Sequence, residues 1–148
     1  MAKNTQIAAA AVNGQGDNLA ARLNNGYLRI YSLTQPTNAD TALGAQVLLA
    51  ELRFSATAAP ATSGGVITFN AITAAVAAAT GTATWFRALQ SDGTTVVMDG
   101  SVDVTGNTPN LVLNSVAISS GANVSVSAFT HTVQKWDLPI LMIRLKNG

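Results

Sequence analysis

Hydrophobic and polar residues alternate in short segments along most of this chain. Such a period of two is expected of a strand that has one buried face. The clearest case is the run from Gln46 to Ser55, in which Leu48, Leu52 and Phe54 share one side with Ala50. The pattern predicts a strand there. The same alternation indicates further strands in several other segments, namely residues 27–31, 66–69, 82–89, 96–104, 111–119 and 123–134.

Turn-forming residues separate these segments at intervals of roughly ten residues. The Asp-Gly pair at residues 92–93 predicts a hairpin turn, and residues 120–123 form a connection of hairpin length. In the last segment the apolar positions slip by one after Val126, which predicts a β-bulge near Ser127 and Ala128. With about eight short strands and no alternation of strand and long helix, we expect an all-β domain. A β-sandwich or jelly roll of antiparallel strands is the architecture that this spacing favours.

One short helix is predicted near the amino terminus. Asp17 stands where a helix N-cap belongs, two leucines four residues apart follow it, and the Asn-Gly pair at residues 25–26 is a stop signal. We therefore expect a helix from about Asn18 to Asn24. The alanine-rich stretch at residues 71–80 stays open between a helix and an irregular connection, although its threonines and the neighbouring strands favour a loop.

The carboxyl-terminal residues 135–148 differ from the rest because they concentrate large apolar side chains. Pro139 lacks an amide donor, so we expect an edge strand or an extended arm. Burial against its own domain is one interpretation, and addition to the sheet edge of a neighbouring subunit is the other. The side chains predicted for an interface in the second case are Trp136, Leu138, Ile140, Leu141, Met142 and Ile143.

Composition suits a single domain over residues 1–148 that contacts other proteins. Only 10% of the residues are charged, against about 25% in an average soluble domain. A surface with so few charges repels its neighbours weakly, which favours assembly. The net charge is +1 and the basic residues are scattered, so we expect no binding to nucleic acid.

The sequence also predicts a soluble protein without disulfide bonds. It contains no cysteine, which removes disulfides and thiolate metal sites. Its longest strongly apolar run, Leu138 to Ile143, is far short of the roughly 20 residues that cross a bilayer. The amino terminus has no convincing export signal, because polar residues interrupt its apolar patch at residues 13–16.

The chemically capable residues do not form a catalytic motif. His131 is the only histidine, and no Asp, Glu or Cys stands at ligand or triad spacing beside it. Asp92, Asp99 and Asp103 belong to one predicted hairpin, and their carboxylates could cluster at its end to bind calcium or to act as an acid–base pair. Turn chemistry already explains Asp92 without either role. The glycines of residues 13–18 lack the flanking strand and helix of a phosphate loop. We expect no enzyme activity, no cofactor and no metal.

Three segments of the chain carry a resemblance to a known family. They are TGTATWFRALQSDGTTVVMDGSV at residues 80–102, RLNNGYLRIYS from residue 22 and DTALGAQVLLAELRFSA from residue 40. Through them the first 130 residues or so resemble small proteins encoded by tailed bacteriophages and prophages, which are usually found among virion structural genes. The shared residues are structural, so the resemblance implies origin and fold more directly than a role.

The resemblance implies a head or tail component of a virion. The leading hypothesis is a capsid decoration, or cement, protein that bridges major capsid subunits as a dimer or trimer. Such a protein would be made in the bacterial cytoplasm and would lie on the capsid surface. A tail or fibre component, and a carbohydrate-binding module for host recognition, are the alternatives.

Overall fold

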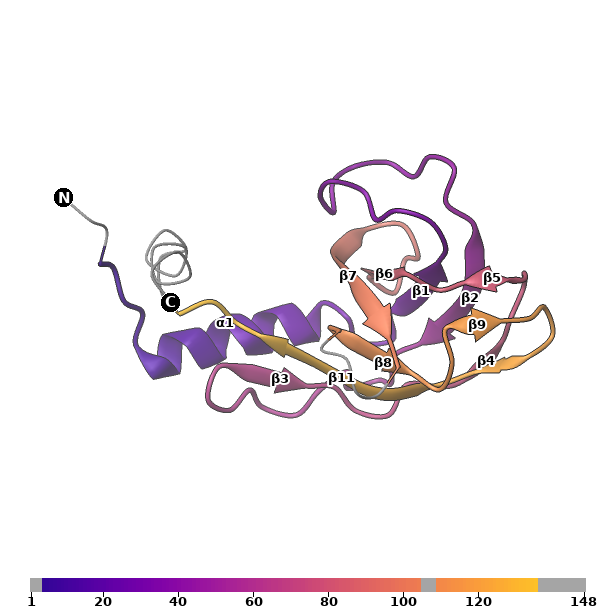
Figure 1. The fold of residues 1–148 in the computed structure, drawn as a ribbon. Helices are drawn as coiled ribbons and strands as arrows, with labels where there is room; N and C mark the ends of the chain where they lie inside the picture. Colours follow the sequence, from indigo (N-terminus) through magenta and orange to yellow (C-terminus); the bar gives the residue numbers. More distant parts are fainter. Residues whose placement is uncertain (1–3, 105–108, 136–148) are drawn as a thin grey trace.

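The computed structural model describes residues 4–104 and 109–135. The described chain consists mostly of strands, with one helix and one large mixed sheet (Figure 1). This confirms the expectation of a mainly β protein. Eleven strands are described, more than the eight or so expected, because several of them contain only two residues each.

The helix, α1 (Ala9–Ala21), overlaps the predicted segment only over residues 18–21 and is longer than predicted. It begins well before Asp17, because the alanines of its first turns favour helix without a side-chain cap. Asp17 is inside the helix instead of capping it, and its carboxylate accepts a hydrogen bond of 2.7 Å from the Thr62 backbone. The stop signal was correct, since a turn follows the helix and ends at Asn25, whose φ is 56°.

The main sheet contains seven strands. In spatial order they are β2 (Leu48–Arg53), β1 (Tyr27–Tyr31), β6 (Trp85–Leu89), β7 (Val96–Asp103), β8 (Leu111–Leu113), β11 (Val126–Thr132) and β3 (Val66–Thr68). Neighbours are antiparallel except β7 and β8, which run parallel. The expectation of antiparallel strands throughout is therefore wrong at this pair.

Two smaller strand pairs extend the fold. They are β4 (Ala75–Val76) with β10 (Asn123–Val124), and β5 (Gly81–Thr82) with β9 (Ala117–Ile118). Residues 71–80, left open by the sequence, hold β4 and no helix. Their backbone follows the outer edge of β2, where the Thr73 and Ala78 amides donate to the Arg53 and Leu49 carbonyls at 3.1 and 2.8 Å. This segment covers part of an otherwise open sheet edge.

Strand irregularities decide which side chains reach the core. The β11 register passes from Val126 to Ala128, which confirms the predicted bulge. A second irregularity in the pairing of β1 with β2 skips Leu49. Leu49 is consequently buried and Leu48 only partly so, which reverses the order expected from strict alternation.

Four phenylalanines join distant parts of the sheet. Phe54 follows β2 and Phe69 follows β3, the two outer strands, yet their ring centroids are 5.7 Å apart. Phe129 of β11 stacks on Phe69 at 4.2 Å and meets the edge of Phe86 from β6 at 5.1 Å. The sheet must therefore curve around this cluster, which forms the centre of the core.

Candidate functional site

The acidic residues considered for calcium or acid–base chemistry are engaged in local structure. Asp92 accepts hydrogen bonds from Thr94 and Thr95, and these bonds lower its pKa to about 2. Asp99 pairs with Arg87, and Asp103 accepts a bond from the amide that follows it. Within residues 4–104 and 109–135, no group of three or more histidine, cysteine or acidic residues could hold a metal ion.

His131 lies on β11 opposite Ile67 of β3. Its side chain is partly buried, and burial lowers its pKa, because the charged imidazolium is less well solvated there. Among the described residues, His131 belongs to no group of histidine and acidic side chains that could hold a metal ion, and it lies on β11, whereas Asp99 and Asp103 lie on β7.

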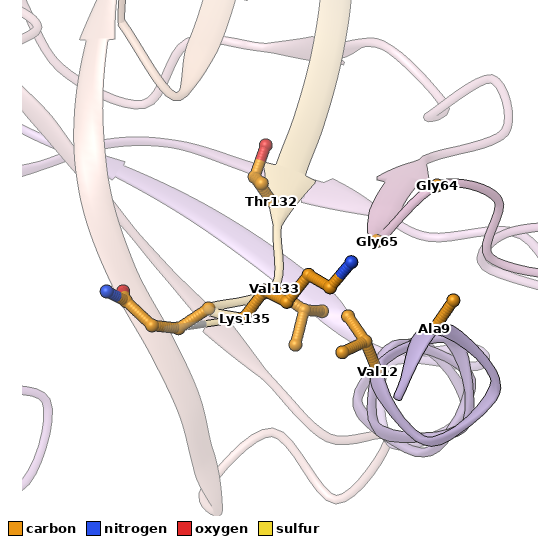
Figure 2. Close-up of a pocket in the computed structure, with 8 residues that line it drawn as sticks. Ala9, Val12, Gly64, Gly65, Thr132, Val133 and Lys135 are labelled. Carbon is orange, nitrogen blue, oxygen red and sulfur yellow. The ribbon is translucent and has the colours of Figure 1, made fainter. Parts of the chain in front are cut away.

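The side chains predicted for an interface, Trp136, Leu138, Ile140, Leu141, Met142 and Ile143, lie outside the described residues. The described chain ends at Lys135, beside a groove of about 420 Å³ between the start of α1 and the end of β11. Figure 2 shows Val12 and Val133 pointing toward one another across this space. The groove is lined by Ala9, Val12, Gly64, Gly65, Thr132, Val133, Gln134 and Lys135.

A more distinctive surface is the connection between β1 and β2, residues 32–47, which we term the 32–47 loop. It contains no strand or helix, and loops of this length are uncommon in compact domains unless they have a function. Four large hydrophobic side chains are exposed in the described chain, and three of them are in this loop: Leu33 at 55%, Leu43 at 43% and Val47 at 46%.

Strand β6 holds the base of the 32–47 loop. The Ser32 amide donates to the Val47 carbonyl at 3.1 Å, which closes the loop on itself. The Trp85 indole donates to the Ser32 carbonyl at 3.3 Å, and the Thr84 hydroxyl donates to the carbonyl of Leu33. Trp85 is fully buried, so this end of the loop rests on the core.

Arg87, two residues further along β6, holds the middle of the loop. Its Nη2 donates to the Thr41 carbonyl at 2.9 Å, and its Nε and Nη2 donate to the two carboxylate oxygens of Asp99, each at 2.8 Å. The Arg87 and Asp99 side chains are only 6% and 3% exposed. The hydrogen bonds that Arg87 donates to the Asp99 carboxylate raise the pKa of Arg87, so the guanidinium stays charged.

Side chains within the loop fix the remaining backbone. The Asn38 carboxamide oxygen accepts from the Asp40 amide and from the Thr41 hydroxyl, both at 3.0 Å. Gln46 donates to the Thr34 carbonyl and accepts from the Gly44 amide, both at 2.7 Å. These contacts, with those from β6, give the loop one defined conformation.

Leu33 has a strained backbone. Its φ is 66°, in the left-handed region that glycine and asparagine tolerate and other residues avoid. A non-glycine residue in that region costs about 1 to 2 kcal/mol. The structure therefore keeps a large apolar side chain both exposed and strained at one position, and such outliers cluster at functional sites.

The sequence segments that carry the phage resemblance interlock at this site. Arg87 belongs to the Trp-Phe-Arg run and Asp99 to the Val-Val-Met-Asp-Gly run, and the two form the buried ion pair. Gly100 lies opposite Phe86 in the β6–β7 pairing, where a Cβ atom would come within 2.6 Å of the Phe86 ring. The motif residues thus build the support beneath the 32–47 loop.

Sequence reasoning did not single out the exposed loop residues. The alternation that places Leu48 and Leu52 on one side puts Val47 on the other, but the exposure of Leu33 and Leu43 is set by the fold. For these two residues the one available signal was the length of the interval between two strong strand patterns.

Comparisons with known proteins identify no relative. No protein-family model, curated protein or solved structure matches the chain. In the described part of the chain, no helix has the length and apolar character needed to cross a membrane.

Proposed function

We propose that this chain is a structural protein of a tailed-bacteriophage virion, and specifically a capsid decoration protein that reinforces the head by bridging major capsid subunits. The observation that carries the proposal is the 32–47 loop, which presents Leu33, Leu43 and Val47 to solvent on a backbone fixed by β6. Exposed apolar residues on a rigid support are characteristic of protein-binding surfaces.

The proposed mechanism depends on contact area and avidity. Each copy buries a modest surface, and a dimer or trimer engages several capsid subunits at once, so that weak single contacts add up to stable attachment. The protein acts on the capsid surface after synthesis in the host cytoplasm. It has no catalytic step, and its partner is the major capsid protein.

We also propose that the domain is a variant of the β-sandwich or jelly roll. The phenylalanine cluster supports this, because it brings residues that follow the two outer strands into contact. Jelly rolls are frequent in capsid proteins, where two layers of strands enclose one core. An experimental structure in which Phe54 and Phe69 lie on opposite, unconnected faces would contradict this assignment.

The copy number in purified virions tests the proposed function. Quantitative mass spectrometry of intact particles should find this protein at a number close to that of the major capsid protein. Particles assembled without it should lose infectivity or release their DNA at a lower temperature than complete particles. A few copies per particle would contradict the proposal and favour a tail or fibre component instead.

A glycan array tests the remaining alternative. Carbohydrate-binding modules commonly use exposed aromatic rings as stacking platforms. In the described chain, the large hydrophobic side chains that are exposed are aliphatic. We therefore expect no specific binding on the array, and a reproducible glycan hit would support the host-recognition alternative.

A further inference from the structure

We propose that Leu33 is the anchor residue of the 32–47 loop, and that its partner is an apolar, uncharged depression on another protein subunit. This inference deepens the proposed function, since it names the residue and the chemistry through which a capsid subunit is bound. It rests on three properties of the loop: a residue that is both strained and exposed, a rigid backbone, and the near absence of charge.

The first step concerns what Leu33 does to its own domain. Its left-handed backbone is unfavourable for leucine, and 55% of the residue remains exposed, so burial offsets little of that strain. Asparagine or glycine at this position would adopt the same φ more easily and would expose less apolar surface. Leucine at position 33 is therefore a poor choice for stability, and a contact outside the domain explains it.

The second step concerns the rigidity of the position. The Leu33 carbonyl accepts from the Thr84 hydroxyl, and the carbonyls on either side of it, those of Ser32 and Thr34, accept from Trp85 and Gln46. Three successive carbonyls are thus held by Thr84, by Trp85 at the start of β6, and by Gln46 at the far end of the loop. A backbone held in this way loses little conformational entropy on binding.

The third step concerns the chemistry of the partner. Asp40 is the only charged residue among residues 32–47. Leu43 and Val47 supply further exposed apolar surface in the same loop. The partner's surface therefore contacts the loop through apolar groups in place of ion pairs. Attachment through the loop should consequently vary little with salt concentration.

The test compares Leu33→Asn and Leu33→Gly with Val76→Asn as a matched control. Val76 is an exposed aliphatic residue of β4, at 67% exposure, outside the loop. Urea unfolding should give Leu33→Asn a midpoint equal to or above that of the wild type. Binding is measured by co-sedimentation with capsids and with complete virions that lack the protein, at low and high sodium chloride.

We expect Leu33→Asn and Leu33→Gly to bind capsids at least about tenfold more weakly than the wild type, as is usual for an anchor residue. Val76→Asn should bind as the wild type does, and salt should change wild-type binding little. Equal binding by Leu33→Asn and the wild type would overturn the inference. A lower unfolding midpoint for both Leu33 variants would also overturn it, because it would show a role inside the domain.

The two particle preparations separate this inference from the proposed function. Binding to complete virions but not to capsids would contradict the decoration role, while the Leu33 comparison would still be measured on the virions. Binding to neither preparation would overturn both. Phosphatidylcholine vesicles serve as a further probe, and vesicle binding that Leu33→Asn abolishes would replace the protein partner with a lipid surface and overturn the inference.

Discussion

The Arg87 guanidinium and the Asp99 carboxylate face each other across β6 and β7 with two hydrogen bonds of 2.8 Å, buried from solvent. Nη2, one of the two guanidinium nitrogens that donate to Asp99, also donates to the Thr41 carbonyl of the 32–47 loop. A pair of this geometry is a specific contact, and removing either partner destabilises the protein because the other charge stays buried without a counter-charge.

Replacing Asp99 by Asn should destabilise the protein by about 3 to 5 kcal/mol, since it leaves the Arg87 charge buried without a counter-charge. The double variant Arg87→Met with Asp99→Leu should recover much of that loss, because no charge remains to be paired. It should nevertheless free the Thr41 segment, so that chymotrypsin cuts the 32–47 loop faster than in the wild type. Urea unfolding and timed digestion measure the two effects.

The exposed pair Arg29 and Glu51 is the control, because its N–O distance of 2.6 Å is short but its side chains are 26% and 39% exposed. Glu51→Gln should cost less than about 1 kcal/mol. Similar losses for Glu51→Gln and Asp99→Asn would show that burial is not what makes the Arg87 pair important.

Gly100→Ala should destabilise the protein by about 1 to 3 kcal/mol through overpacking. The added Cβ would come within 2.6 Å of the Phe86 ring, which is fully buried. Gly14→Ala is the opposite case, because it lies inside α1 and its Cβ would meet no atom within 4 Å. That change should stabilise the protein by about 0.5 to 1 kcal/mol. Thermal unfolding of both variants gives the comparison, and a neutral Gly100→Ala would mean that Phe86 relaxes.

Acidification should weaken the fold partly through His131. Burial lowers its pKa in the folded state, so the unfolded chain binds a proton more readily than the folded one. The resulting stability is present above the unfolded pKa, near 6.5, and is lost as the pH falls through and below that value. His131→Gln should therefore reduce the slope of unfolding free energy against pH between about 7.5 and 5.5. An unchanged slope in urea titrations would exclude His131 as the cause.

Truncation after Lys135 should leave a folded domain, since it retains every member of the buried hydrophobic cluster that the described residues form, from Ala20 to Phe129. The hydrogen bond from the Val133 amide to the Gly65 carbonyl, of 2.7 Å, is also retained. We expect an unfolding temperature within about 5 °C of the wild type. Loss of self-association or of capsid binding by this folded variant would support an interface at residues 136–148, whereas unfolding would assign them to the core.

Local alternation of side chains predicted much of the sheet. The strands around Leu28 and Leu52 were found because each has one face more buried than the other, and the turn at Asp92 and Gly93 because its residue types are specific. The strand around Trp85 was also found, although the structure buries both of its faces. The bulge in β11 was visible for the same reason, as a slip in the pattern after Val126.

The remaining features depend on contacts between distant residues, which no local pattern contains. The helix begins at Ala9 because alanine propensity outweighs the missing cap, a balance that the apparent N-cap at Asp17 concealed. The parallel pairing of β7 with β8 joins Val102 to Leu111, which the alternation within either strand does not indicate. The left-handed Leu33 is held by distant residues, because Thr84 bonds its carbonyl and Gln46 bonds that of the next residue, Thr34.

The support of the 32–47 loop comes from residues made after it. Ser32, Leu33 and Thr41 leave the ribosome before Thr84, Trp85 and Arg87, which bond to them. Arg87 in turn needs its partner Asp99, which is made later still. A growing or misfolded chain consequently lacks the shape of this surface, even though it already contains every residue of the loop. Recognition through the loop would act as a check on each copy, admitting to an assembly only those molecules whose sheet has formed.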